Sequence, residues 1–299
     1  MRARRTSLVL VLLLSLAACA PVPGSTGTGT LPVGSSRHSL DVNGTGREFV
    51  VYRPPAAAAD GYPVVVMLHG GLGSAQQAER SYSWDDVASS QGFVVLYPDG
   101  LDRAWNAGSC CGAPARTAVD DVGFITAALA EVGRMVRVDP RRIYVTGMSN
   151  GAMMAYRLAC ETDAFAAVAP VAGDQMVECG HRSPASLLHI HGTADAKVPL
   201  DGSPGSGVGK VDGPPVQQVV DGWLEADRCG PLARTSTGEV TTATASCAQG
   251  RAVELVTVAG AGHQWPGSGV STYPGADRPS AAFSATDLIW AFFSAHPKP

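Results

Sequence analysis

Short runs of apolar residues, none of which alternates with polar ones, recur along the chain. They lie at residues 63–68 (PVVVML), 93–97, 143–145, 166–171 and 187–190. A strand in a parallel sheet is covered by helices on both faces, so its sequence is a continuous apolar run rather than an alternating one. These runs therefore predict the buried strands of a mostly parallel sheet.

Segments of helical character separate these runs. Their composition and the spacing of their apolar positions predict helices at residues 75–89, 122–136, 152–160, 216–227 and 284–295. Residues 39–53, around the turn NGTG at 43–46, predict an antiparallel hairpin, and residues 239–258 predict paired strands. Residues 98–117 and 199–215 are predicted to be long loops. Strands alternating with helices indicate an α/β fold, with a mostly parallel central sheet flanked by helices.

The N-terminus has the pattern of an export signal. Arg2, Arg4 and Arg5 precede an apolar run at residues 8–16, which is too short to cross a bilayer. The run ends in LAAC at 16–19, which resembles the bacterial lipobox, so Cys19 is predicted to carry a lipid. The alternative is ordinary cleavage nearby and a freely secreted protein. We expect a signal peptide at 1–19, a flexible Gly, Ser, Thr and Pro-rich linker at 20–35 and one domain at 36–299.

Composition and charge narrow the possible partners. The chain has 299 residues, 45% of them hydrophobic, and a formal net charge of −4, which gives no reason to expect a nucleic-acid partner. Assigning one of the seven cysteines to lipid leaves six, and export favours disulfides. Proximity along the chain suggests Cys160–Cys179 and Cys229–Cys247 but does not determine the connectivity. The adjacent Cys110 and Cys111 are then either a vicinal bridge or a free pair.

A G-x-S-x-G sequence at Gly147 to Gly151 lies between a predicted strand and a predicted helix. This is the context of a nucleophile elbow, in which a sharp turn exposes the serine hydroxyl and glycines avoid collisions with neighbouring backbone. The sequence predicts Ser149 as the nucleophile. The alternative is a glycine-rich turn with an idle serine.

A serine hydroxyl needs a base, and a neutral histidine is the natural one near pH 7. In this kind of fold the triad follows the order Ser, Asp or Glu, then His. His263 satisfies the order and lies in the glycine-flanked loop AGAGHQWPG, directly after the apolar run at 253–258. His189 and His191 should share one face of a strand; no third metal ligand is evident for them, so buried, hydrogen-bonded rings are favoured over a metal site.

The orienting acid has two candidates, each following a predicted strand. Asp195 is favoured over Asp174 because the later strand is the commoner position of the acid in this fold. Asp120 and Asp121 are better explained as a helix N-cap pair.

The oxyanion of an acyl-transfer intermediate needs two backbone N–H groups. We expect one from Asn150, the residue after the nucleophile, and one from Gly71 in the turn HGGL at 69–72, with Leu72 as the alternative. The turn could also be a plain strand end.

Taken together, these motifs resemble those of the LpqC-like and poly(3-hydroxybutyrate) depolymerase-like esterases, which are related to bacterial feruloyl and acetylxylan esterases. The resemblance implies an α/β-hydrolase fold, hydrolysis through an acyl-enzyme, no metal and no organic cofactor. It also suggests that Trp265 and Trp105 line the substrate pocket, although both could pack at its rim. The motifs are LHGG (68–71), WNAGSCCG (105–112), VDDVGFI (119–125), GMSNGAMM (147–154), HIHGTAD (189–195) and GHQWPG (262–267).

The sequence thus predicts an exported serine esterase that acts on a small or oligomeric ester and is held at the extracytoplasmic membrane face through Cys19, or secreted. The alternatives are a serine peptidase of the same fold and a non-catalytic surface-binding lipoprotein. Neither the physiological ester nor the oligomeric state follows from these residues.

Overall fold

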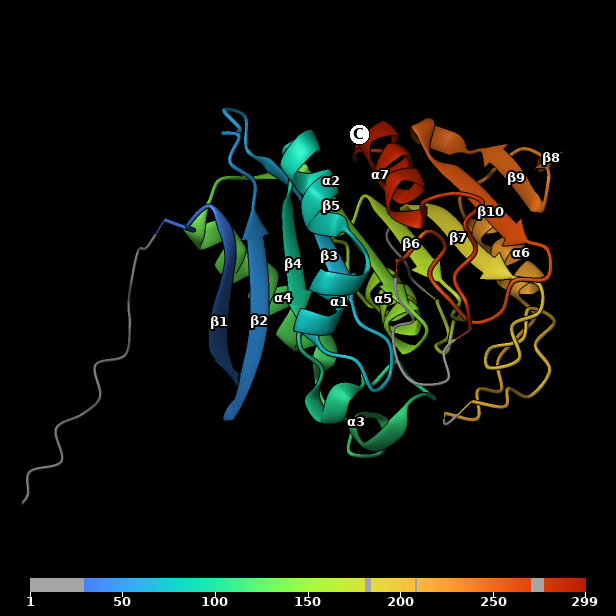
Figure 1. Cartoon of the computed structure of the whole chain (residues 1–299), viewed down its shortest axis with the longest axis horizontal. Helices are drawn as coiled ribbons and strands as arrows, with labels where there is room; N and C mark the ends of the chain where they lie inside the picture. Colours follow the sequence, from blue (N-terminus) through green and yellow to red (C-terminus); the bar gives the residue numbers. More distant parts are fainter. Residues whose placement is uncertain (1–29, 181–183, 208, 270–276) are drawn as a thin grey trace, which may run out of the picture.

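The computed structural model describes residues 30–180, 184–207, 209–269 and 277–299. The predicted signal peptide and Cys19 lie outside these residues. A ten-stranded sheet in the order β1-β2-β4-β3-β5-β6-β7-β10-β9-β8 runs through the molecule (Figure 1). The strands are β1 (Gly34–Val42), β2 (Thr45–Arg53), β3 (Tyr62–Leu68), β4 (Val94–Pro98), β5 (Val138–Met148), β6 (Ala167–Val171), β7 (Ser186–Gly192), β8 (Ala233–Thr237), β9 (Val240–Ser246) and β10 (Ala252–Val258).

The centre of the sheet is parallel and its edges are antiparallel. Neighbouring strands from β4 to β7 pair in parallel, as the uninterrupted apolar runs predict. The strand β10, which the sequence predicts only as one of a set of paired strands, adds to β7 in parallel. The β1–β2 hairpin joins β4 antiparallel at one edge, and β9 and β8 continue antiparallel beyond β10 at the other. This is the α/β-hydrolase arrangement, so the predicted fold is confirmed.

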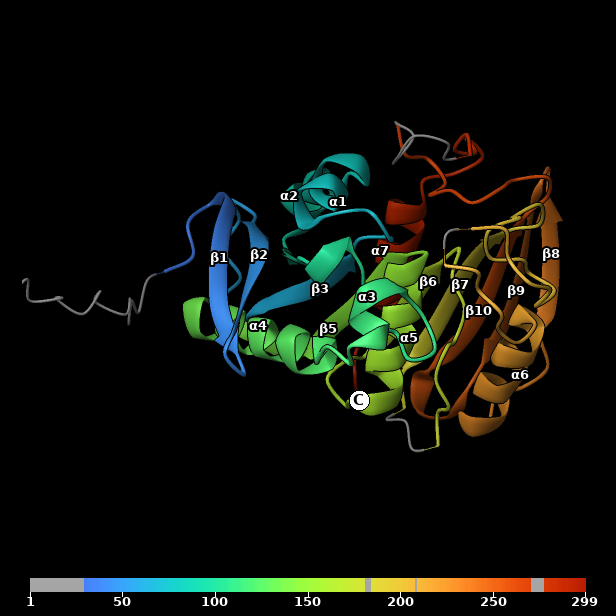
Figure 2. The same ribbon diagram turned by 90° about the horizontal axis from the view of Figure 1, so that it is seen from below.

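Helices cover both faces of the sheet, and Figure 2 shows the two layers. Side chains alternate along a strand, so Val64 and Val66 of β3 pack in one core and Val65 and Met67 in the other. The first core contains residues of α4, α5 and α6, and the second contains residues of α1, α2 and α7. The helices are α1 (Ala75–Ser81), α2 (Trp84–Gln91), α3 (Gly112–Arg116), α4 (Asp121–Met135), α5 (Asn150–Glu161), α6 (Val216–Ala226) and α7 (Ala285–Ala295).

Four details differ from the expected elements. The helix predicted at 75–89 is two helices, because Ser83 takes a left-handed conformation with φ 55° between α1 and α2. The region predicted as a loop at 98–117 contains a 3-10 turn, Leu101–Arg103, and the short α3. The antiparallel region gains β8, which precedes the predicted residues. The linker ends earlier than residue 35, since Leu31 is buried and β1 begins at Gly34.

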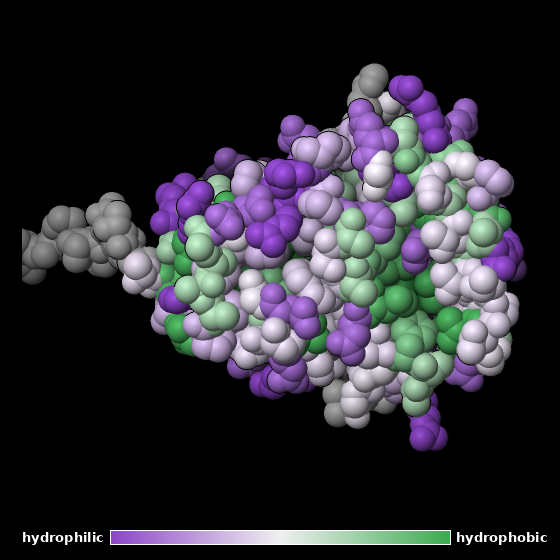
Figure 3. Space-filling model, turned by 90° about the horizontal axis from the view of Figure 1, so that it is seen from above, coloured by the Kyte–Doolittle hydropathy of each residue, from purple (hydrophilic) through white to green (hydrophobic). Residues whose placement is uncertain are grey.

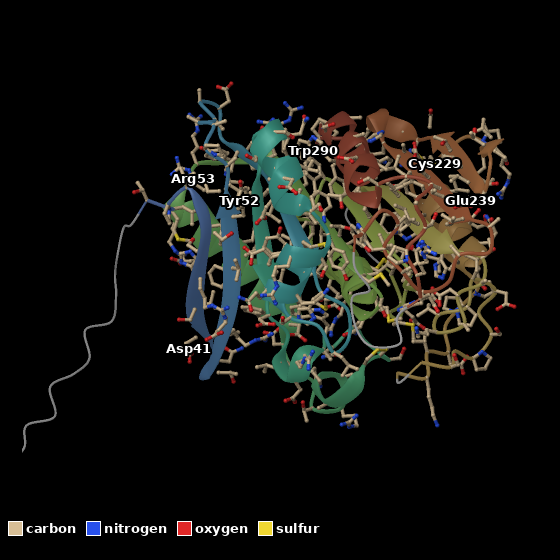
Figure 4. The ribbon with its side chains drawn as sticks, in the orientation of Figure 1. Asp41, Tyr52, Arg53, Cys229, Glu239 and Trp290 are labelled. Atoms are coloured by element: carbon tan, nitrogen blue, oxygen red, sulfur yellow. A yellow bond between two sulfur atoms is a disulfide. The ribbon has the colours of Figure 1, made fainter. Side chains whose placement is uncertain are left out.

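Three disulfides are present, Cys110–Cys111, Cys160–Cys179 and Cys229–Cys247. The two pairings suggested by proximity are therefore confirmed, and the adjacent cysteines form the vicinal bridge. Cys229 lies beside the C-terminal edge strands in Figure 4. The bonds tie α5 to the loop after β6, and the end of α6 to the end of β9.

At the hairpin edge, Asp41 accepts a hydrogen bond from the Gly44 amide at 2.8 Å and closes the β1–β2 turn (Figure 4). On the face at which the parallel strands begin, hydrophobic residues gather over the half that contains β6 to β10 (Figure 3). No described helix combines the length and apolar character needed to cross a membrane.

Candidate active site

Ser149 occupies the sharp turn between β5 and α5. Its backbone is strained, with φ 56° and ψ −120°. A Cβ on Gly147 would lie 2.5 Å from the carbonyl oxygen of Gly151, and a Cβ on Gly151 would overlap the carbonyl oxygen of Leu68. Only glycine fits at both flanking positions, because strand, turn and helix backbone meet there. The structure therefore has the geometry of the predicted elbow.

Asp195 and His263 meet after β7 and β10, which are adjacent parallel strands. The Nδ1 of His263 lies 2.7 Å from Oδ2 of Asp195, and both side chains are buried. The other oxygen, Oδ1, accepts the amides of Lys197 at 2.8 Å and Val198 at 2.9 Å. Burial alone would raise the pKa of Asp195, but the hydrogen bond and charge of His263, with His191 nearby, hold it below its ordinary value. Asp195 is thus an ionised partner for the imidazole.

Backbone hydrogen bonds join the two loops that carry this pair. Thr193 donates to the carbonyl of Val258 at 3.0 Å, and Ala194 donates to that of Ala261 at 2.9 Å. The Thr193 hydroxyl accepts the amide of Gly260 at 2.9 Å. A Cβ on Gly192 would overlap the Ala261 carbonyl, so glycine is needed where the loops touch. The relative position of acid and base is therefore set by backbone.

A cavity of about 500 Å³ opens at the carboxyl ends of the parallel strands, the side from which Figure 2 is viewed. Ser149 and His263 both line it, together with Gly71 and Asn150. The predicted nucleophile, base and oxyanion-hole residues thus share one chamber. Its apolar wall is formed by Leu72, Tyr82, Cys111, Met148, Met153, Val198 and Val211.

The turn after β3 is anchored by His69. Its Nε2 accepts the Gly100 amide at 2.9 Å, so Nδ1 carries the proton and donates to the Gly70 carbonyl at 2.8 Å. Burial lowers the pKa of His69, which agrees with a neutral ring. The Leu72 amide already donates to the Arg103 carbonyl at 2.8 Å. Of the two residues considered for the oxyanion hole, this leaves the Gly71 amide available.

The two tryptophans expected at the substrate pocket are buried behind it. Trp105 donates from Nε1 to the His69 carbonyl at 2.8 Å, and its backbone N–H and C=O bind the side chain of Asn150. Trp265 donates from Nε1 to the Thr286 hydroxyl at 3.1 Å. Neither indole lines the cavity, which goes against the expected substrate contact. Trp105 instead ties the long loop to the oxyanion turn and to the elbow.

The rival acidic residues have other partners. Asp174 is buried, and its Oδ1 accepts the amide of Gln175 at 2.7 Å; burial raises its pKa to about 7. Asp120 caps α4 by accepting the Gly123 amide at 2.8 Å, as predicted. Asp121, expected to share this capping role, lies in the first turn of α4 and has other partners: it forms a buried ion pair with Arg47 at 2.6 Å and accepts the amide of Asn106 at 2.8 Å.

Sequence reasoning missed Asp277, whose Oδ2 accepts the backbone amide of His263 at 2.7 Å. Lys197 lies 3.7 Å from the same carboxylate. Asp277 lies in a loop, and no local pattern marked it.

Known proteins identify the family of the chain. The family described as Esterase PHB depolymerase matches residues 47–196. The putative esterase NocK of Nocardia uniformis subsp. tsuyamanensis is 34% identical over 272 residues, covering 82% of this chain and 76% of that protein. Feruloyl esterase B of Piromyces equi is 30% identical over 236 residues, covering 73% of this chain but only 42% of that protein.

Among solved structures, an acetyl xylan esterase from Aspergillus awamori superposes with a TM-score of 0.60 at 16% identity, covering 87% of this chain and 99% of that one. At that identity the likeness shows the fold alone. The family match and the NocK similarity carry the assignment. The chain therefore belongs to the Esterase PHB depolymerase family, a family of carboxylic ester hydrolases with an α/β-hydrolase fold.

Proposed function

We propose that this protein is an exported serine esterase that hydrolyses carboxylic esters through an acyl-enzyme, with Ser149, His263 and Asp195 as its triad. The observation that carries the proposal is the 2.7 Å bond from His263 Nδ1 to Asp195 Oδ2, at a cavity that Ser149 also lines. An ionised Asp195 holds the proton on Nδ1 and leaves Nε2 as the basic nitrogen.

In the first half-reaction, Ser149 Oγ gives its proton to His263 Nε2 and attacks the ester carbonyl carbon. The amides of Asn150 and Gly71 donate hydrogen bonds to the oxygen that becomes negative. Asn150 is the first residue of α5, so its N–H has no partner within the helix. The alcohol leaves with the proton from His263. Water then gives a proton to His263 Nε2 and attacks the carbonyl carbon of the acyl-enzyme. The bond to Ser149 Oγ breaks, Ser149 takes the proton back from His263, and the acid is released.

The substrate we propose is a small or oligomeric ester whose apolar part lies against the sulfur-containing wall of Cys111, Met148 and Met153. The names of the relatives suggest feruloyl, acetyl-xylan and hydroxybutyrate esters as the first panel for the purified protein. The three disulfides support export, because such bonds persist in oxidising compartments. We propose that Cys19 carries the lipid, which Cys19→Ala would release from the membrane fraction.

The nucleophile is tested by Ser149→Ala. We expect hydrolysis of a short p-nitrophenyl ester to fall by about 10⁴- to 10⁶-fold, because the remaining groups cannot form the acyl-enzyme. A fluorophosphonate probe should label the wild type and not the variant. The matched control is Ser90→Ala, an exposed serine on α2 whose hydroxyl donates to the carbonyl of Val87. Wild-type activity in a folded Ser149→Ala protein would refute the triad.

A further inference from the structure

Behind the catalytic acid, three buried side chains form a continuous row of hydrogen bonds. The Tyr156 hydroxyl of α5 lies 2.7 Å from Nδ1 of His189, and Nε2 of His189 lies 2.9 Å from Nδ1 of His191. Nε2 of His191 lies 2.7 Å from the carbonyl oxygen of Val198. Both histidines stand on β7 and are at most 1% exposed. The prediction of buried, hydrogen-bonded histidines is thus confirmed.

The chemistry of the last acceptor determines the direction of the whole row. A carbonyl oxygen only accepts, so His191 must carry its proton on Nε2. Burial holds the pKa of His191 below its ordinary value and that of His189 well below it, so each ring is neutral and has one N–H. Nδ1 of His191 therefore accepts from Nε2–H of His189. Nδ1 of His189 in turn accepts from the hydroxyl of Tyr156.

Val198 is consequently held from both sides. Its N–H donates to Asp195 Oδ1 at 2.9 Å, while its carbonyl accepts from His191 at 2.7 Å. The Nε2–H of His191 also lies 3.5 Å from Asp195 Oδ2, the oxygen that binds His263. Losing the His191 bond would free the peptide that follows Val198. The N–H that binds the Asp195 carboxylate belongs to the preceding peptide, which is joined to it at the Val198 Cα, so a rotation there shifts the carboxylate's partner.

We propose that His191 is a positioning residue for ester hydrolysis: through the Val198 carbonyl it fixes the turn that presents Asp195 Oδ2 to His263. His189 and Tyr156 set the orientation and tautomer of the His191 ring. This inference rests on the proposed triad. His191 does not itself line the cavity, whereas Val198 of the turn that it holds does. We therefore expect His191 to affect the rate of the chemical step more than substrate binding.

Two substitutions at His191 separate its two hydrogen bonds. In His191→Gln the amide N–H₂ reaches the position of Nε2 and keeps the bond to the Val198 carbonyl. In His191→Asn the shorter side chain keeps an acceptor near Nδ1 for His189 and loses the bond to Val198. We expect kcat to fall by about 10- to 100-fold in His191→Asn, with KM within about twofold of the wild type. A displacement of His263 by a fraction of an ångström is enough to produce a loss of this size. His191→Gln should retain kcat within about fivefold.

The control is His38→Gln, a histidine of β1 that bonds Ser36 and should leave kcat unchanged. Equal losses in His191→Asn and His191→Gln, or a change in thermal midpoint alone, would mean that His191 only fills space, which overturns the inference. Nitrogen-15 NMR of the wild-type imidazoles tests it without any variant: both β7 histidines should show the Nε2–H tautomer, and an Nδ1–H tautomer at His191 would overturn it. Activity in Ser149→Ala, by contrast, would refute the triad itself.

Discussion

Replacing Asp195 by asparagine tests how the acid works, because the side chain keeps its shape and loses its charge. Oδ1 of Asp195 accepts two amides, those of Lys197 and Val198, and Oδ2 faces His263. Asparagine can satisfy the two amides only with its oxygen. Its N–H₂ group must then point at Nδ1 of His263.

The consequence for the imidazole is a change of tautomer. Nδ1 has to accept from the new N–H₂, so the proton moves to Nε2, the nitrogen that should take the proton of Ser149. The opposite orientation of the asparagine amide would place its N–H₂ group against the backbone N–H groups of Lys197 and Val198. Two buried hydrogen bonds, each worth about 1 kcal/mol, would then be lost. We therefore expect kcat to fall by about 10⁴-fold, which corresponds to about 5.5 kcal/mol in the barrier.

The assay is steady-state hydrolysis of a p-nitrophenyl ester at neutral pH, with the thermal midpoint measured in parallel. The midpoint should fall by only about 2 to 6 °C, since the turn keeps its backbone bonds. Asp201→Asn is the matched control, because this carboxylate lies on an exposed turn and binds only Ser203. A folded Asp195→Asn protein with activity within tenfold of the wild type would refute this account of the acid.

Three further predictions concern stability. Gly147→Ala places a methyl group 2.5 Å from backbone atoms of α5 and should lower the free energy of unfolding, measured by denaturant titration, by about 3 kcal/mol. Its control is Gly222→Ala on α6, where the added methyl group meets open space and should leave the free energy of unfolding unchanged or raise it. Burial raises the pKa of Asp174 from 3.8 to about 7, so its protonated form stabilises the folded state; this stabilisation is complete below pH 3.8 and is lost as the pH rises through 7. The free energy of unfolding of Asp174→Asn should therefore equal that of the wild type at pH 4 and exceed it by about 1 to 4 kcal/mol at pH 8.5, and equal values at both pH values would contradict this. Arg47→Met leaves the Asp121 carboxylate buried without its cationic partner and should lower the free energy of unfolding by about 3 to 5 kcal/mol at pH 7. A thermal midpoint equal to that of the wild type would contradict this.

Features that depend on neighbours along the chain could be predicted from the amino-acid sequence. Uninterrupted apolar runs identified the parallel strands, since a strand covered on both faces has no polar face. The glycines around Ser149 marked the elbow because the turn leaves no room for a Cβ. Chain order and loop position singled out His263. The short spacing of Cys160 and Cys179 made their pairing a reasonable expectation.

Which distant groups meet depends on how the chain folds in space. Asp195 and Asp174 both follow parallel strands, but β10, which leads to His263, pairs with β7 and not with β6. The sequence predicts Trp105 at the pocket, whereas in the structure its loop folds back and its indole binds the His69 carbonyl. A hydrogen bond depends on the separation of two atoms in space, and a one-dimensional pattern records that separation only within a single helix, strand or turn. The row from Tyr156 to Val198 therefore exists only in the folded molecule.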